Sequence, residues 1–281
     1  MAVVSDVELA ATKQDLIAAR VQQEIAFRAK LAPFFLDVSQ FAVKGAKSIS
    51  FPKLTSFTAP DRATGVAGVP VVLTSTVDTL DLVHRPYVSW VVDMNDEIQS
   101  TLNFQMEAAA RAAAAHGRRF DNEVISVLEA AGIATTTAGA FSYGISLEMR
   151  DALLSNEADM NDAVWIMSGD QETALLNIDE YKRQDTYGPN GAIRGGVIGE
   201  LFGAPVVRHN GLGANTFYLA AKDAIAYGFQ RSPAIGSEDA IAHGVGAKLW
   251  AMDQLFGVDA MLLGEGSAAP AESAFIIKDN N

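Results

Sequence analysis

The residues that could do chemistry in this sequence are scattered, and none of them belongs to a complete catalytic motif. Ser50-Phe51-Pro52-Lys53 matches the pattern S-x-x-K, the nucleophile and base of penicillin-recognising enzymes. That chemistry needs both side chains on one face of a helix, whereas Phe51 and Pro52 favour an extended strand. Because four-residue patterns often arise by chance, we expect no catalytic role for this one.

The glycines and histidines lead to the same expectation. Gly211 with Gly213, and Gly244 with Gly246, are G-x-G fragments without the third glycine of a dinucleotide-binding loop, so turn or packing roles are favoured. P-loop, nucleophile-elbow and H-E-x-x-H patterns do not occur. The histidines lie in separate predicted elements without metal-ligand spacing: His84, His116, His209 and His243. We expect no catalytic, cofactor or metal site.

Composition limits the remaining classes of protein. A chain of 281 residues with 49% hydrophobic residues can form one large domain or two modest ones. Zero cysteines exclude disulfides. The start, MAVVSDVELAATKQD, lacks the features of a signal peptide, and no apolar run reaches the length of a membrane helix. Stability must therefore come from packing.

The charge pattern argues against a nucleic-acid-binding patch. The formal net charge is −13, from 21 basic and 34 acidic residues, and Lys and Arg form no cluster. Arg118 and Arg119 are an isolated pair. We expect them on a solvated helix turn or in an ion pair with Asp121 or Glu123.

The first third of the chain is predicted to be an arm followed by an extended excursion. Residues 6–30 favour a helix, and ISFPKL at 49–54 favours an edge strand. Residues 55–92 are almost entirely extended, with prolines and glycines that predict a mobile hairpin tip. Since a long two-stranded excursion is only marginally stable alone, it should need a neighbouring molecule.

A long helix is predicted over residues 95–131, with Gly117 as its one interruption. Its length would be roughly 55 Å at about 1.5 Å per residue. The alanines at 112–115 have little side-chain bulk, so another element can approach the helix axis there. Gly117 costs about 1 kcal/mol relative to alanine in a helix interior, which suggests a weak point or hinge.

The second half of the chain is predicted to alternate short helices and strands. The expected elements are helices at 145–156 and at 170–179, the latter capped by Asp170, a buried strand at 163–169, a turn and strand at 199–210, a strand and short helix at 217–228, and two strands around Gly246 and Gly257. Residues 179–196 form the longest predicted irregular loop.

In this order, the parts resemble the major capsid proteins of tailed bacteriophages with the Hong Kong 97-type fold. The resemblance covers nearly the whole chain. It depends on SISFPKL before the extended loop, on SWVVDMNDEIQ before the long helix, and on GELFGAPVVRHN late in the α/β module. The fold class that it implies is α+β.

The resemblance also implies a division of the chain. Residues 1–46 would be an N-terminal arm and 47–92 an extended loop that reaches over a neighbouring subunit. Residues 93–140 would be a peripheral domain with its spine helix, 141–240 an axial domain, and 241–281 the return strands of the peripheral domain with a C-terminal tail. The expected assembly contacts are Phe51, Arg62, Gly65, Gly68, Tyr187, Asn190 and Arg194, with Gly117 as the spine hinge.

The implied function is self-assembly, as hexamers and pentamers, into an icosahedral shell that encloses a DNA genome without sequence-specific binding. The short arm before ISFPKL suggests a separate scaffolding protein. A portal and a decoration protein are further expected partners, with assembly in the bacterial host cytoplasm and no enzymatic activity. Two alternatives stay open at this point: an encapsulin-like cellular nanocompartment, and a soluble α/β enzyme that uses residues 145–240.

Overall fold

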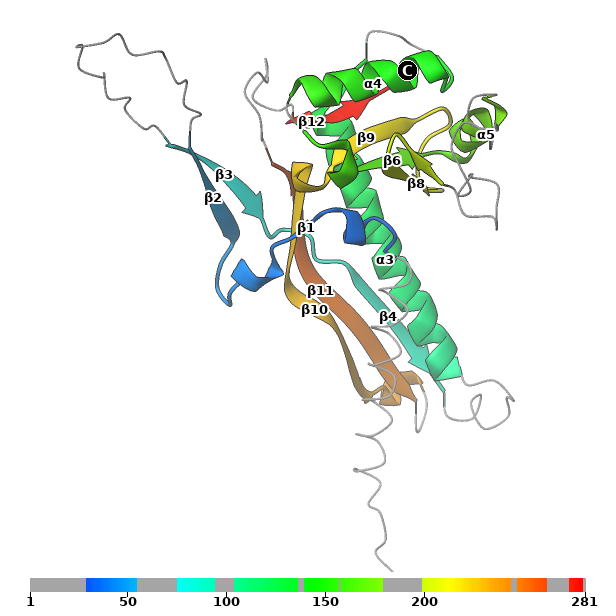
Figure 1. Ribbon diagram of the computed structural model, residues 1–281. Helices are drawn as coiled ribbons and strands as arrows, with labels where there is room; N and C mark the ends of the chain where they lie inside the picture. Colours follow the sequence, from blue (N-terminus) through cyan, green and yellow to red (C-terminus); the bar gives the residue numbers. More distant parts are fainter. Residues whose placement is uncertain are drawn as a thin grey trace, which may run out of the picture.

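The fold combines helices and strands in two sheets and a separate hairpin, which confirms the expected α+β class. The computed structural model describes residues 29–54, 75–93, 104–135, 139–156, 158–178, 199–243, 247–261 and 273–279. The described helices and strands fall into an elongated layer, an α/β module at one end of it, and the hairpin, which projects to one side (Figure 1).

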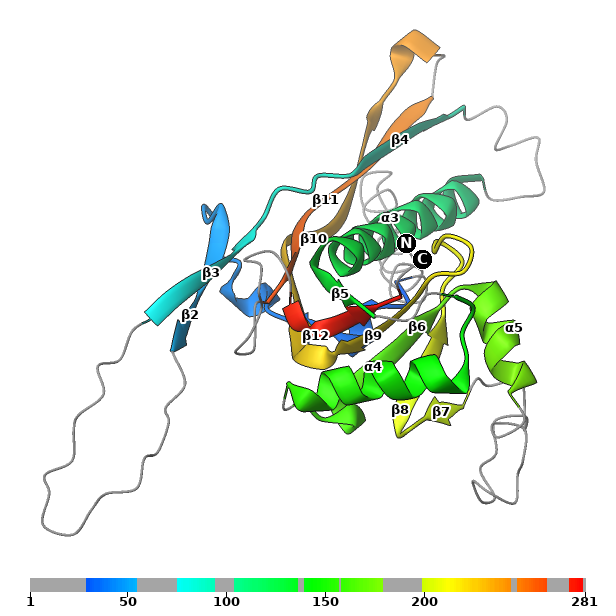
Figure 2. The same cartoon turned by 90° about the horizontal axis from the view of Figure 1, so that it is seen from above.

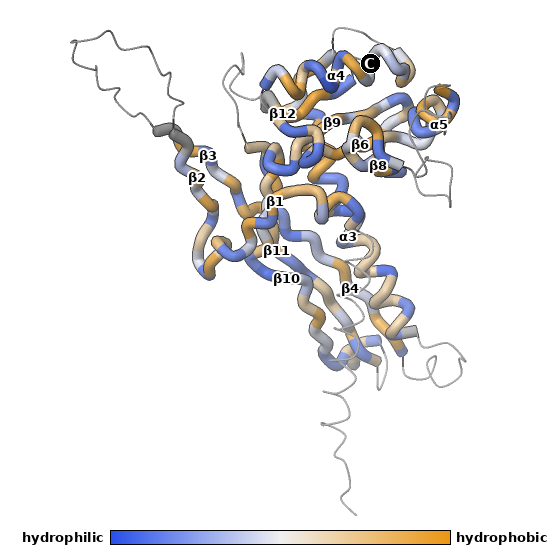
Figure 3. Tube along the Cα trace, viewed as in Figure 1, coloured by the Kyte–Doolittle hydropathy of each residue, from blue (hydrophilic) through white to orange (hydrophobic). Residues whose placement is uncertain are grey.

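The elongated layer is a long helix lying along a four-stranded sheet. The helix is α3 (Phe104–Ala131), and it runs without interruption through Gly117. The strands, in spatial order, are β1 (Leu36–Asp37), β10 (Ile225–Asp239), β11 (Lys248–Ala260) and β4 (Tyr87–Val92). Figure 3 shows both orange and blue segments along β10 and β11. On β11 buried residues alternate with partly buried ones from Trp250 to Phe256, as expected where one face of a sheet is covered.

Small residues bring α3 close to the sheet. Ala109, Ala112 and Ala113 are buried and pack in one cluster with Trp250 and Met252 of β11. An alanine face lets the helix approach the strands more closely than leucines would, as expected from the sequence. The residues of β4 that face this cluster alternate with exposed ones, so this edge strand has one covered and one open face.

The α/β module is built on a six-stranded sheet held between α3 and α4 (Figure 2). Its central strand β6 is buried at every residue, and Trp165 is fully buried. The strands in spatial order are β5 (Gly132–Ala134), β12 (Ser273–Lys278), β9 (Phe217–Ala221), β6 (Ala163–Met167), β8 (Ala204–Arg208) and β7 (Glu200–Leu201); the helices are α4 (Tyr143–Ser155) and α5 (Gly169–Asn177).

Short 3-10 helices connect these elements. They are η1 (Ala32–Phe34), η2 (Ser39–Phe41), η3 (Met160–Asp162), η4 (Lys222–Ala224) and η5 (Ile241–His243).

The structure corrects several predicted boundaries. Residues 225–239 were expected in the axial module but form β10 of the long sheet, where β11 pairs with them along most of their length. The short helix expected before residue 228 is replaced by the turn η4. β11 continues through Gly257 as one strand, and the strand expected around Gly246 lies partly outside the described residues.

Further corrections concern helix ends and the C-terminal segment. Ser168, and not Asp170, occupies the N-cap position of α5. Residues 273–278 were expected in a tail of the peripheral domain, and they instead form β12 inside the six-stranded sheet. Residues 94–103, the expected start of the long helix, lie outside the described residues.

The hairpin consists of β2 (Ser48–Leu54) and β3 (Ser75–Asp81), which pair with each other. Its root is packed through Ile49 and Leu80, which lie in a cluster with Val38 and Ala226. This root crosses the long sheet at a glycine pair, because Gly228 of β10 is opposite Gly257 of β11.

Gly257 is required by the close approach of the hairpin backbone. A Cβ atom at this position would collide with the carbonyl oxygen of Asp81, which belongs to the backbone and cannot rotate away. A Cβ atom on Gly228 would lie 3.3 Å from Ile49 Cδ1, a tighter fit than usual. The pair therefore fixes where the hairpin leaves the layer.

We predict that Gly257→Ala destabilises the subunit by about 1–3 kcal/mol, the usual cost of overpacking. Gly236→Ala is the matched control, because this β10 glycine has open space where a Cβ would be added. Urea unfolding of unassembled subunits measures both. An equal effect of the two substitutions would show that the glycine pair does not fix the hairpin root.

Candidate functional site

Two of the sequence-predicted site residues, Phe51 and Gly117, lie among the described residues. Phe51 is half-buried on β2 and packs against the cluster at the hairpin root. Gly117 is buried in the middle of α3. The other expected assembly contacts lie outside the described residues: Arg62, Gly65, Gly68, Tyr187, Asn190 and Arg194.

The residues of the possible catalytic patterns lie on a strand, in a turn and in a 3-10 helix. Ser50 and Lys53 both lie on the strand β2, whereas the chemistry of this pattern needs both residues on a helix. Gly211 lies beside the ring of His209 in the turn after β8, and His243 is exposed in η5. The described part of the chain contains no cluster of His, Asp and Glu suited to a metal ion, and no described helix is long and apolar enough to cross a membrane.

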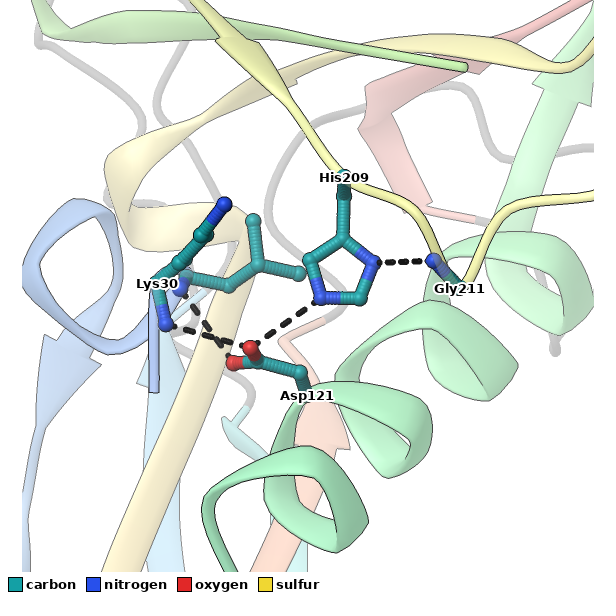
Figure 4. A network of polar contacts seen from close by, with 5 residues as sticks. Lys30, Asp121, His209 and Gly211 are labelled. Atoms are coloured by element: carbon teal, nitrogen blue, oxygen red, sulfur yellow. Dashed lines mark hydrogen bonds and ion pairs between the residues drawn. The ribbon is translucent and has the colours of Figure 1, made fainter. Parts of the chain in front are cut away.

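A buried carboxylate joins three distant parts of the chain (Figure 4). Asp121 of α3 is 1% exposed, and it accepts hydrogen bonds from the backbone amides of Lys30 and Leu31 at 3.1 and 3.3 Å. His209, at the end of β8, donates to Asp121 Oδ2 from Nε2 at 3.1 Å. We call Lys30, Leu31, Asp121, His209 and Gly211 the polar hub.

The hydrogen bonds of the polar hub define the state of its histidine. The backbone amide of Gly211 donates to Nδ1 of His209 at 3.0 Å, so Nδ1 must carry a lone pair. Nε2 must then carry the proton that bonds Asp121. In this tautomer Nδ1 accepts and Nε2 donates, so Asp121 receives three N–H donors.

A second polar tie joins the end of α3 to the module. The Tyr218 hydroxyl donates to Glu129 Oε2 at 2.6 Å, and Lys278 Nζ donates to the Glu129 carbonyl at 2.8 Å. The Tyr218 hydrogen bond is the main reason why the pKa of Glu129 lies below its ordinary value, and Lys278 adds to the effect. Burial, followed by Glu129, raises the pKa of Tyr218, so its hydroxyl stays a donor.

An open groove of about 690 Å³ lies between these two ties. One wall is α3 and the other is the connection between β8 and β9; the lining includes Asn122, Ser126, Glu129, Gly213, Thr216 and Tyr218. The carboxylate of Glu129, which lines the groove, already accepts hydrogen bonds from Tyr218 and Lys278. Glu129 and Tyr218, two of the polar residues that line the groove, therefore already hold α3 against the module.

Large apolar side chains lie uncovered on the hairpin side of the molecule. Val77 of β3, Val83, and Tyr87 of β4 are 58%, 63% and 63% exposed. Phe41 and Val43, in and after η2, are exposed as well. Uncovered apolar side chains of this size are candidates for contacts with another molecule.

Sequence reasoning missed the polar hub. Asp121 and Glu123 were the two expected ion-pair partners of Arg118 and Arg119. Arg119 does pair with Glu123, whereas Asp121 turns inward. A local signal exists, because Asp121 falls on the apolar stripe formed by Phe120, Val124 and Leu128. The partner, His209, is 88 residues away and has no local signal.

A projecting hairpin, a long helix on a long sheet and a compact α/β module together define the Hong Kong 97-type class of shell-forming proteins. Residues 87–260 match the family model described as phage capsid protein. The chain belongs to this phage capsid protein family, and it is a structural protein of the virion shell. The family match supports the capsid interpretation over the nanocompartment and enzyme alternatives.

Solved structures show the same fold at low sequence identity. A chain of Mycobacterium phage Che8 is 18% identical, with a TM-score of 0.72 over 89% of this chain and 90% of that one. The capsid of cyanophage P-SCSP1u has 11% identity and a TM-score of 0.66, over 88% and 86% of the two chains. The capsid of a native GTA particle has 15% identity and a TM-score of 0.63, over 90% and 89%. No curated protein matches the sequence.

We predict that Asp121→Asn lowers the free energy of unfolding by about 1.5–3 kcal/mol, the range for hydrogen bonds to a charged group. The amide would place a donor among the three N–H groups of the polar hub. Asp151→Asn, exposed on α4, is the control. Urea unfolding measures both variants. A loss of unfolding free energy no greater than that of the control would contradict a structural role for the carboxylate.

Proposed function

We propose that this capsid protein assembles through its hairpin, as hexamers and pentamers, into an icosahedral shell around a DNA genome. The observation that carries the proposal is the projecting β2–β3 hairpin, which exposes Val77 and is followed by the exposed Val83 and Tyr87. Two strands that pair with each other bury little surface, so such a hairpin is marginally stable until another molecule covers it.

The neighbouring subunit is the proposed cover. Residues 47–92 reach over it as the extended loop, with contacts from Phe51, Arg62, Gly65 and Gly68. The open face of the long sheet suits this contact, because Tyr87 and Val91 are exposed on β4 and Gly236 of β10 has open space above it. Each subunit would thereby cover one neighbour and be covered by another, which closes a ring.

The rest of the chain takes the remaining roles in this proposal. Residues 1–46 are the arm, 93–140 the peripheral domain with its spine helix, and 141–240 the axial domain, except that β10 returns to the peripheral sheet. The loop at 179–196 lies at the centre of each capsomer, where Tyr187, Asn190 and Arg194 make contacts between subunits.

The proposed partners follow from this role. A separate scaffolding protein guides assembly in the bacterial cytoplasm, a portal occupies one vertex, and a decoration protein binds the finished shell. The subunit carries out no catalysis. A net charge of −13 keeps the shell from binding duplex DNA tightly, because tight binding of phosphates needs many Lys and Arg residues.

We predict that deletion of Arg62–Val69, the tip of the extended loop, leaves a folded and soluble subunit that forms no shells. The deletion removes contact surface outside the subunit core, so its thermal unfolding should match that of the full chain. Electron microscopy and sedimentation measure assembly. A variant with the same eight positions replaced by Gly and Ser separates loop length from loop sequence; normal shells from the deletion would refute the loop as an assembly contact.

The spine helix is proposed to bend at Gly117 when the particle expands. We predict that Gly117→Ala stabilises the isolated subunit by up to about 1 kcal/mol and slows expansion, because alanine stiffens a helix interior. Gly144→Ala in the first turn of α4 is the control. Light scattering or electron microscopy of particles over time gives the rate, and a normal rate for Gly117→Ala would rule out the hinge.

A further inference from the structure

Two polar side chains are sealed in the contact between α3 and β11 without hydrogen-bond partners. His116 of α3 is 1% exposed and Gln254 of β11 is 3% exposed. Neither imidazole nitrogen of His116, and neither amide atom of Gln254, has a hydrogen-bond partner among the described residues. Buried polar groups are nearly always paired, so four unpaired atoms at one contact require an explanation.

The two side chains face each other across the contact. The amide of Gln254 and the carbonyl of Met252 lie close enough to His116 to stabilise its charged form, although neither makes a well-aligned hydrogen bond to it. The indole nitrogens of Trp90 and Trp250, further along the same covered face, also lack partners among the described residues. Polar groups along this face are therefore incompletely satisfied.

The surroundings of His116 cannot solvate a charge. Ala112 and Ala113 precede it on the covered face of α3, buried Gly117 follows it, and the next large buried side chain, Phe120, is apolar. Asp253 is the charged group that acts on His116, and its carboxylate is held by Arg231 of β10 at 2.8 Å. Further along α3, Glu123 pairs with Arg119 and lies 3.6 Å from His84.

We propose that His116 is a buried proton sensor whose protonation loosens the contact between α3 and β11. A charged imidazole would need two acceptors, and the contact offers it a poorly aligned carbonyl and amide. Moving the helix away from the strand admits water to both nitrogens. The sensor belongs to the single subunit, so it acts in unassembled protein as well as in shells.

The direction of the pH effect follows from burial. Burial is the largest influence on His116 and lowers its pKa below the ordinary value of 6.5, while Gln254, the Met252 carbonyl and Asp253 oppose it. The unfolded or opened chain therefore binds a proton at a higher pH than the closed contact does. The contribution of the neutral imidazole is complete above the ordinary pKa and is lost as the pH falls below it.

Hydrogen exchange of α3 between pH 7.5 and 5.0, corrected for the intrinsic pH dependence, tests this directly. We expect the protection of residues 109–120 to fall by up to tenfold per pH unit in the wild type, the limit for uptake of one proton. His116→Gln, which cannot titrate, should keep constant protection. His243→Gln, which removes an exposed histidine, should behave like the wild type.

Gln254→Glu provides a second test that does not remove the imidazole. A carboxylate facing His116 would stabilise its charged form, so the loss of protection on acidification should shrink. Titration of the histidine Cε1–H NMR signals identifies which histidine takes up the proton. The proposal is overturned if His116→Gln loses protection as the wild type does, or if Gln254→Glu opens on acidification as fully as the wild type.

Discussion

The long sheet and the six-stranded sheet of this subunit both pack against one helix, and the helix has two different faces along its length. The N-terminal half of α3 presents alanines to the long sheet, so helix and strands approach closely and share a thin layer of side chains. The C-terminal half presents Phe120, Val124 and Leu128 to the core of the module. Because deep burial stabilises in proportion to the apolar area removed from water, the module end of the helix is held more firmly than the sheet end.

The buried polar residues of α3 lie where these two halves meet, and they differ in how well they are satisfied. Asp121 receives three N–H donors from the arm and from β8, which makes it a fixed point for chain segments far apart in sequence. His116, five residues earlier, has no partner among the described residues. A satisfied network resists movement, whereas an unsatisfied one favours any rearrangement that admits water. The helix is therefore anchored on one side of Gly117 and only weakly held beside it.

Local patterns predicted the elements that one segment of chain can define. The strand at β6, the helices α4 and α5 and the long helix follow from apolar periodicity and from their turns. β10 was missed because residues 217–228 were predicted to end in a short helix, and its pairing with β11 includes an irregular register near Arg231. The polar hub was missed for a related reason: the sequence placed Asp121 on the apolar stripe, but nothing local identifies His209 as its partner. Contacts that depend on distant pairing are the ones that a single sequence does not disclose.

The root of the hairpin is fixed within the subunit, whereas its outer part is left to be covered by another molecule. The root is fixed because Gly228 and Gly257 let Ile49 and Leu80 seat directly on the long sheet. Its outer part keeps Val77 exposed and has no covering element among the described residues. The subunit therefore sets the angle at which the hairpin leaves, while the surface that covers its apolar side chains must come from another molecule. Because the orientation of the hairpin is already fixed in the free subunit, less conformational entropy is lost on assembly.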